Sequence, residues 1–460
     1  MTTVNGQQSI DMSKFYKIQN ADGKCWWMPV RGMRVGLALY QPSGWKGRML
    51  KRWLPWLHWS RLVRAVLGIE NGELRIENLM PEELRRAVCE AFGVREFEYS
   101  VFGGTPSVHQ KTVIQVWNDE RILGYVKVTE SEEVGRLFFR EAEFLRKITD
   151  NISLTENNIS LTEPSERTEF LSLRDVLSPT DNTDLKDFLP SGFNDSLFLA
   201  SLKKRSTDDT DFYAEATPAG LLSTCNGLQI AECVPEARAM RVRSEELGVR
   251  SDGLWVLVQT TRKSLESVMV REWGEMLEEF LERLYDATAQ EMAWEESGVA
   301  RALCDLREHV DWLPDGVDGE AVAKRIDAVV ERMAGKRVKY GAYHGDFTPW
   351  NMFVEKGELF VFDWEYAGWG YPKGLDRYHF WMQTAIHEKH WGAEELLRYV
   401  GSVDGEWIDG EMLEMYVLDV MSKYVMREGG RVKDVGAFEV WGAVITARVP
   451  AGDFVHSRSE

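Results

Sequence analysis

The sequence predicts an α+β protein with two lobes, a β-rich half followed by a mainly helical half. Two observations support this prediction. Short apolar runs bounded by turn residues recur between residues 96 and 262, whereas apolar residues recur at helical spacing after residue 263. A third observation locates a candidate functional site. Near the middle of the helical half, the stretch "YHGDFTPWNMFVEKGELFVFDWEYAG" places several acids among Val, Phe and Leu.

Residues 97–149 of the β-rich half predict three strands and a helix. The runs "EYSVFGGTPS", "KTVIQVW" and "ILGYVKV" are expected to be strands, with turns at the glycines and at residues 118–120. "EVGRLFFREAEFLRKI" is expected to be the helix. Two further β-like runs, "GLQIAECVP" and "GLWVLVQTT", precede the helical half.

We expect boundaries near residues 95 and 262. They separate an N-terminal segment (1–95), a β-rich lobe (96–262) and a helical lobe (263–460) that contains the acidic stretch. Residues from about 150 to 213 are rich in Asn, Ser, Thr and Asp and repeat "NISLTE" in tandem. Two short copies do not make a repeat architecture, so this region is expected to be an insertion in the β-rich lobe.

The N-terminal segment is basic and rich in Trp. Residues 25–69 contain no Asp or Glu, although the whole chain has a formal net charge of −19. We expect Pro55 to interrupt any helix here. One interpretation is a small domain with a Trp core that docks on the acidic remainder. The other is peripheral contact with an anionic membrane through residues 45–68.

Composition excludes several classes of protein. The negative charge disfavours nucleic-acid binding, because phosphate contacts need Lys and Arg. Five Cys without a CxxC pair favour a reducing cytosol. A polar start and the absence of an apolar run of about 18 residues predict neither a signal peptide nor a spanning helix. We therefore expect a cytoplasmic protein, with the inner face of the membrane as the alternative.

The spacing of residues in the acidic stretch suits a site that binds a metal ion and a substrate hydroxyl. Four residues separate Asp346 from Asn351, and a predicted hairpin turning at Lys356–Gly357 separates Asn351 from Asp363. Such a hairpin brings Asn351 and Asp363 to the same end of two strands. An amide oxygen and a carboxylate are hard ligands that suit Mg²⁺.

This order of residues resembles a known group. "HGDFTPWN" and "FDWEYAGWGYPKGLD" are similar to the catalytic loop and metal segment of the aminoglycoside phosphotransferase and choline/ethanolamine kinase superfamily. The resemblance covers roughly residues 97–450 and implies the protein-kinase-like fold. It also implies ATP and Mg²⁺ as cofactors, and phosphoryl transfer from ATP to an alcohol group.

The resemblance implies roles in the helical lobe. Asp346 corresponds to the catalytic Asp that orients the attacking hydroxyl, while Asn351 and Asp363 correspond to the Mg²⁺ ligands. His344 is expected to brace the loop. Glu365 is expected to contact metal-bound water or substrate.

In the β-rich lobe, the resemblance implies a nucleotide-binding pair. Lys127 is expected to reach the phosphates while paired with Glu141, with Glu143 as the rival partner. Gly103 and Gly104 are expected to cover the phosphates through their backbone amides, and "VLVQTT" to contact the adenine.

The acceptor is expected to be a small molecule, because no long activation segment follows Asp363. Aromatic residues near the loop are suited to a sugar ring or a quaternary ammonium: Trp350, Trp364, Tyr366 and Trp369. The leading hypothesis is a kinase of a saccharide or similar small alcohol, in cell-surface glycan metabolism. The alternatives are a choline/ethanolamine-type kinase, an aminoglycoside phosphotransferase and, from another class, a nucleotide-binding pseudokinase scaffold.

Overall fold

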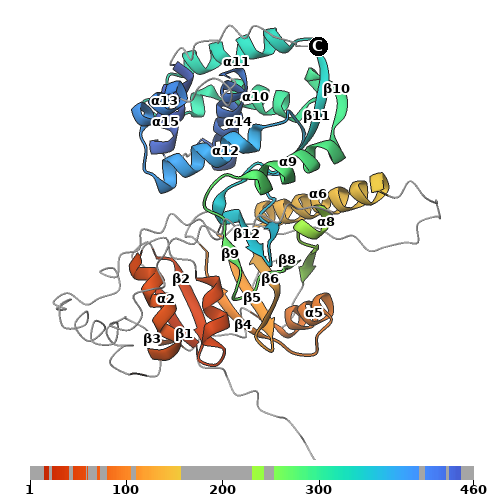
Figure 1. Cartoon of the computed structure of the whole chain (residues 1–460), viewed down its shortest axis with the longest axis vertical. Helices are drawn as coiled ribbons and strands as arrows, with labels where there is room; N and C mark the ends of the chain where they lie inside the picture. The colour runs from red at the N-terminus through yellow and green to blue at the C-terminus, as the bar shows by residue number, and fades with distance from the viewer. Residues whose placement is uncertain are drawn as a thin grey trace, which may run out of the picture.

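The structure is a computed structural model. It describes residues 15–19, 23–40, 45–57, 60, 70–72, 80–104, 110–156, 230–242, 253–402, 410–430 and 435–446. Two lobes lie one above the other, joined beside the long helix α6 (Figure 1). The predicted α+β, two-lobed fold class is confirmed.

An eight-stranded antiparallel sheet forms the N-terminal lobe, in the order β3-β1-β2-β4-β5-β6-β8-β7. At its centre are the three strands expected after residue 96, with alternate or continuous burial that suits a covered sheet. Their bounds, together with that of β8, are β4 (Glu98–Phe102), β5 (Thr112–Asn118), β6 (Arg121–Thr129) and β8 (Leu254–Thr260). β7 (Ala237–Val242) forms one edge of the sheet.

The N-terminal segment contributes strands to this sheet. β1 (Phe15–Gln19), β2 (Cys25–Pro29) and β3 (Glu70–Gly72) extend it, and β2 pairs with β4 through Trp26 opposite Phe102. Many of its apolar side chains form a shared core with the sheet, including Trp26, Tyr40 and Leu54. The expected boundary at residue 95 therefore crosses a continuous sheet, and it stays a prediction.

Among the described residues, four helical elements accompany these strands: α1 (Met33–Gly36), η1 (Leu37–Leu39), α2 (Trp45–Leu57) and α5 (Glu82–Phe92). The expectation that Pro55 would interrupt a helix was wrong, since Pro55 lies inside α2. Pro55 is two residues from the C-terminal end of α2. There, a missing N–H removes one hydrogen bond without breaking a long run of them.

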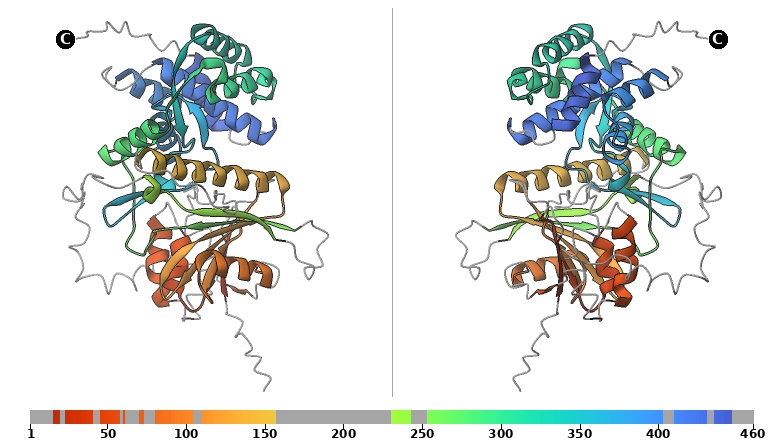
Figure 2. Two further views of the ribbon diagram at one scale, coloured as in Figure 1. Left: turned by 90° about the vertical axis from the view of Figure 1, so that its right-hand side faces the viewer. Right: turned by 90° about the vertical axis from the view of Figure 1, so that its left-hand side faces the viewer.

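Helix α6 (Glu132–Glu156) lies between the sheet and the second lobe (Figure 2). Its first half packs Val134 and Phe138 against Leu257 of β8. Its second half packs Phe144 and Ile148 against the second lobe. The predicted strand at "GLQIAECVP" is wrong within the described residues, where α8 (Ile230–Cys233) is a short helix. α8 buries Ile230 and Cys233 against α6, so tertiary packing outweighs the strand pattern. The rest of the expected insertion, beyond the end of α6, lies outside the described residues.

The C-terminal lobe is built mainly from helices around one apolar core that includes Leu303, Ile326, Tyr416 and Trp441. Its longer helices are α9 (Glu275–Thr288), α10 (Gly298–Glu308), α11 (Gly319–Met333), α12 (Leu375–Gln383), α13 (Ala393–Ser402), α14 (Gly410–Glu428) and α15 (Val435–Thr446). Short elements connect them: η3 (Trp294–Glu296), η4 (Val310–Trp312), η5 (Pro349–Asn351) and the π-helix η6 (Thr384–Glu388).

Two small sheets position the acidic stretch. β10 (Gln290–Ala293), β11 (Arg337–Tyr343) and β14 (Gly368–Tyr371) form one, while β9 (Val268–Met269), β12 (Met352–Glu355) and β13 (Glu358–Val361) form the other. The expected hairpin is present, with Glu355 opposite Glu358 and positive φ at Lys356 and Gly357. Two positive φ angles are what a two-residue hairpin turn requires.

Candidate active site

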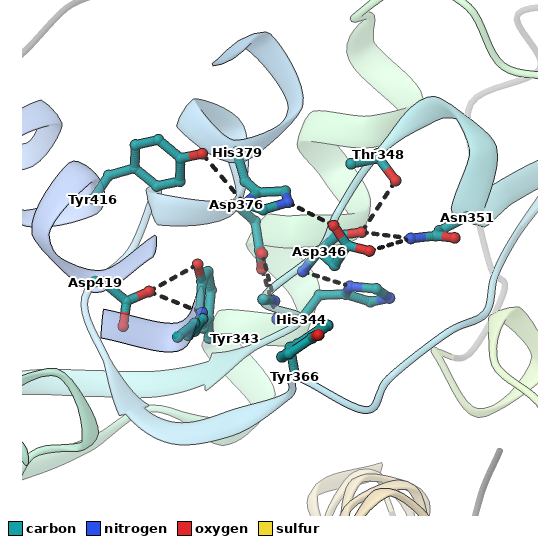
Figure 3. A network of polar contacts seen from close by, with 12 residues as sticks. Tyr343, His344, Asp346, Thr348, Asn351, Tyr366, Asp376, His379, Tyr416 and Asp419 are labelled. Atoms are coloured by element: carbon teal, nitrogen blue, oxygen red, sulfur yellow. Dashed lines mark hydrogen bonds and ion pairs between the residues drawn. The ribbon is translucent and has the colours of Figure 1, made fainter. Parts of the chain in front are cut away.

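The Asp346 side chain is held on both carboxylate oxygens. Asn351 Nδ2 donates to Asp346 Oδ2 at 2.8 Å and to its backbone carbonyl at 2.9 Å. On the other side, His379 Nε2 lies 2.7 Å from Oδ1 (Figure 3). The carboxylate is only partly covered, with 21% of the side chain exposed. Asp346 is therefore fixed in orientation and still reachable by a ligand.

Asp376, at the start of α12, supports the backbone of this loop. Its two oxygens accept the N–H groups of His344 at 2.8 Å and Gly345 at 2.9 Å. Gly345 has φ +83, and a Cβ there would lie 2.3 Å from the carbonyl oxygen of Tyr366, so the loop requires glycine. Burial raises the pKa of Asp376 to about 7, against the opposing effect of the two N–H groups.

His344 is fully buried and links the loop to the end of the hairpin. Its Nδ1 accepts the N–H of Asp346 at 3.2 Å, so its Nε2–H donates to the carbonyl of Phe362 at 3.1 Å. Both ring nitrogens are used by backbone groups. This arrangement is that of a neutral histidine that braces the loop.

Buried tyrosines from the helical lobe lie behind these residues. Tyr343 donates to Asp419 Oδ2 at 3.1 Å, and Lys423 Nζ pairs with the same carboxylate at 2.8 Å. Tyr416 OH lies 3.4 Å from His379 Nδ1. Burial raises the pKa of Tyr343 and of Tyr416 well above its usual value, so both hydroxyls keep their protons as donors.

The segment Asp363–Trp364–Glu365 is held from the N-terminal lobe by three side chains. Lys127 Nζ of β6 lies 3.6 Å from Asp363 Oδ1, and Glu141 Oε1 of α6 accepts the Trp364 N–H at 3.0 Å. Lys111, just before β5, forms an ion pair with Glu365. Asp363 itself has φ +79, a strained conformation for a non-glycine residue. Such strain is typical of functional positions that the surrounding structure fixes.

The end of the hairpin provides the donors that a magnesium ion prefers. Phe362 N–H donates to the carbonyl of Asn351 at 2.9 Å, which places Asn351 and Asp363 at the same end of β12 and β13. Asn351 turns its Nδ2 toward Asp346, so its Oδ1 points away from Asp346 (Figure 3). Within the described residues there is no group of three or more His, Cys, Asp or Glu that could enclose a metal. A site with two protein ligands fits Mg²⁺, which keeps waters and substrate phosphates in its shell.

Comparisons with known proteins identify this part of the chain. Residues 234–373 match the family model described as the phosphotransferase enzyme family, and they include the loop and the acidic segment. These residues therefore match the phosphotransferase family that the sequence resembles, and the predicted phosphotransferase activity is confirmed with this match. No curated protein matches the sequence.

Solved structures are similar at low identity. A thermostable mutant of aminoglycoside phosphotransferase APH(4)-Ia, solved with ADP and hygromycin B, is 11% identical with a TM-score of 0.40, covering 80% of this chain and 99% of that one. Choline kinase LicA from Streptococcus pneumoniae is 10% identical with a TM-score of 0.38, covering 79% and 96%. Amicoumacin kinase hAmiN is 13% identical with a TM-score of 0.33, covering 78% and 89%.

The expected nucleotide-binding residues of the phosphotransferase are placed as follows. Lys127 and Glu141 both reach the Asp363–Trp364–Glu365 segment, whereas the rival Glu143 pairs with Lys147 on an exposed face of α6. Gly104 has φ +78, and a Cβ there would lie 2.1 Å from the carbonyl oxygen of Lys111. Gly103 donates its N–H to Cys25 in β2. The glycines therefore have a packing role, and the tip of their turn lies outside the described residues.

The four aromatic candidates fall into different environments. Trp364 is fully buried, with its ring 4.5 Å from that of His344, and leaves no surface for a ligand. Trp350 is buried beside His387, and the half-buried Trp369 packs against Phe144. Tyr366 is half-buried and accepts a hydrogen bond from Arg427. Trp364 and Trp369 belong to the core, while Tyr366 lies next to the loop that bears Asp346 (Figure 3).

A cavity of about 450 Å³ lies on the other face of α12 from Asp346. Tyr378, Trp381, Met382 and Ala385 line it at helical spacing, while His379 of the same helix contacts Asp346. Its remaining wall includes Trp273, Glu388 and Trp391. Helix α12 therefore contributes one set of side chains to the cavity and a different one, His379, to the loop that bears Asp346.

Sequence reasoning missed Lys111, Asp376 and His379. Asp376 and His379 lie three residues apart in the helical stretch "LDRYHFW", so they share one face of the helix. This spacing could have identified them from the sequence. Lys111 had no such signal, because only the fold brings β5 to Glu365.

Proposed function

We propose that this phosphotransferase is an ATP- and Mg²⁺-dependent kinase that transfers the γ-phosphate to a hydroxyl group of a small molecule. The observation that carries the proposal is the geometry of Asp346. Its carboxylate is held by Asn351 and His379, remains partly exposed, and adjoins the end of the hairpin that bears Asp363. Phosphoryl transfer depends on this kind of positioning next to a metal-binding edge.

Each residue then has a defined task. Asp346 accepts a hydrogen bond from the acceptor hydroxyl and orients it, because both carboxylate oxygens carry negative charge. Asn351 Oδ1 and Asp363 hold the metal ion, and Lys127 binds the nucleotide phosphates. A bound Mg²⁺ supplies positive charge for the phosphate oxygens. Glu141 fixes the metal segment through the Trp364 N–H, and His344 braces the loop.

For the acceptor, we propose a saccharide or similar small alcohol, with a role in cell-surface glycan metabolism. Tyr366 and Arg427 support this proposal, because they give an aromatic ring and a hydrogen-bond donor beside the loop. A choline/ethanolamine-type acceptor is the second candidate, supported by the order of residues in "DWEYAGWGY". An aminoglycoside is the third, and the pseudokinase scaffold is the alternative from another class.

The test is a panel assay. Purified protein with ATP and Mg²⁺ is offered sugars, amino alcohols and aminoglycosides, and acceptor-dependent ADP formation is measured. The saccharide proposal predicts turnover on the sugar panel above the ATPase background. Turnover confined to amino alcohols or aminoglycosides selects the corresponding alternative. Nucleotide binding without any turnover favours the scaffold.

We also propose that α2 contacts an anionic membrane surface. Trp56 is 72% exposed and Trp53 is 40% exposed, while Arg48 and Arg52 are exposed on the same helix. Arg48, Arg52 and Trp56 are four residues apart, so they share one face. Leu54 is buried in the core and anchors the opposite face. None of the described helices is long and apolar enough to span a membrane, so contact would be peripheral.

Vesicle sedimentation tests this contact. The protein is expected to sediment with phosphatidylserine-containing vesicles at low salt and to be released as salt rises. Trp56→Ser with Arg52→Gln should weaken sedimentation, whereas Lys324→Gln, on an exposed face of α11, should not. Equal recovery with purely zwitterionic vesicles would contradict the proposal.

A further inference from the structure

Lys111 is an unusual lysine in this protein. Only 5% of the residue is exposed, and its ammonium forms an ion pair with Glu365, itself 7% exposed. Burial of a lysine is costly unless an anion accompanies it. The pair also joins the two lobes, because Lys111 precedes β5 and Glu365 follows the hairpin of the C-terminal lobe. Desolvation of both charges at the lobe boundary costs free energy, and a functional role of the pair would account for that cost.

Its position is next to the proposed phosphate site. Glu365 is two residues from Asp363, which lies 3.6 Å from the ammonium of Lys127. Lys111 and Lys127 lie close to each other across paired strands, since Val113 of β5 is opposite Lys127 of β6. Two ammonium groups from neighbouring strands therefore reach two carboxylates of one short segment.

Charge balance suggests what happens when ligands enter. Lys111 and Lys127 face the carboxylates of Asp363 and Glu365, and the buried Glu141 adds a third carboxylate to the same segment. A divalent cation that bound beside these carboxylates would be repelled by the two ammonium groups. A nucleoside triphosphate is strongly anionic and offers both lysines a new partner at the same edge.

We propose that Lys111 is a second phosphate-binding lysine, which neutralises Glu365 in the nucleotide-free protein and moves its ammonium to the β- and γ-phosphates of a bound nucleotide. The inference rests on the proposed kinase function and deepens it. Lys111 then couples the entry of the nucleotide to the release of Glu365 toward the metal ion and its waters. Gly104 packs against the backbone of Lys111, which fixes the point from which the lysine side chain extends.

The test compares nucleotides with and without the outer phosphates. Dissociation constants for AMP-PNP and for AMP are measured with Mg²⁺ by calorimetry, for the wild type and for Lys111→Gln. Loss of a charge-assisted hydrogen bond is expected to weaken AMP-PNP binding about 10- to 100-fold. AMP, which lacks the β- and γ-phosphates, should bind nearly as before. Lys324→Gln, a lysine 72% exposed on α11, is the matched control and should change neither constant.

A second variant separates binding from folding. Lys111→Met with Glu365→Met removes both charges together, a change that buried ion pairs often tolerate. It should keep a melting temperature close to that of the wild type and still lose AMP-PNP affinity relative to AMP. Equal AMP-PNP affinity in the wild type and in both Lys111 variants would overturn the inference. If the wild type itself bound no AMP-PNP, the proposed function would fail before the inference was reached.

Discussion

His379 Nε2 lies 2.7 Å from Asp346 Oδ1, and Tyr416 OH lies 3.4 Å from the other nitrogen of the same ring. A carboxylate oxygen can only accept, so Nε2–H of His379 donates to Asp346. The imidazole is therefore held as a hydrogen-bond donor to the carboxylate. His379 is a positioning residue that acts through Asp346.

Replacement of His379 tests this relationship. His379→Ala removes a hydrogen bond to a charged group, which is typically worth about 1.5–3 kcal/mol, so kcat should fall about tenfold or more. The Kd for AMP-PNP should stay near that of the wild type. His379→Asn, whose amide can also donate, should recover part of kcat. His309→Ala is the control, because His309 contacts the ring of Trp312 in η4 and the carbonyl of Asp305 and not Asp346. Equal kcat values for Ala and Asn at position 379 would argue against a positioning hydrogen bond.

Asp376 predicts a pH-dependent stability. Its pKa of about 7 is above that of an unfolded Asp, so its contribution to the free energy of unfolding is lost as pH rises through 7. Between pH 6 and 8 this loss is on the order of 1 kcal/mol. Lys423, Asp419 and Tyr343 are titratable groups that interact with it, and the backbone N–H groups of His344 and Gly345 donate to it.

A variant is needed to isolate the effect of Asp376, because Lys263 changes the free energy of unfolding with pH in the opposite direction. Burial lowers the pKa of Lys263 to about 7, which makes the folded protein more stable as pH rises through that value. Denaturant unfolding at pH 6 and 8 should therefore be compared between the wild type and Asp376→Asn. The wild type should lose on the order of 1 kcal/mol relative to the variant. A constant difference between the two proteins at both pH values would show that Asp376 does not titrate there.

The backbone at position 104, between β4 and β5, requires glycine. Gly104→Ala places a Cβ 2.1 Å from the Lys111 carbonyl oxygen at φ +78, so it should lower the free energy of unfolding by about 1–3 kcal/mol. Gly274→Ala is the matched control. Gly274 has negative φ, and an added Cβ there meets no described heavy atom within 4 Å. Denaturant unfolding of the two variants should differ clearly, and similar values would refute the assigned strain.

The sequence allowed much of the fold and of the site to be predicted, for physical reasons that differ between elements. β5, β6 and α6 carry clear period-two or helical patterns, and the hairpin at Lys356–Gly357 follows from its turn residues. Local patterns failed where tertiary contacts decide. α8 is helical through packing on α6, and Lys111 meets Glu365 only after the lobes assemble.

The central claim is that Asp346 orients a hydroxyl for phosphoryl transfer. The most direct test is Asp346→Asn, assayed by ADP formation with the best acceptor of the panel and by AMP-PNP binding with Mg²⁺. The account predicts a fall in kcat of about 10²- to 10⁴-fold, the range for a lost general base, with AMP-PNP affinity retained. Unchanged turnover in this variant would contradict the account.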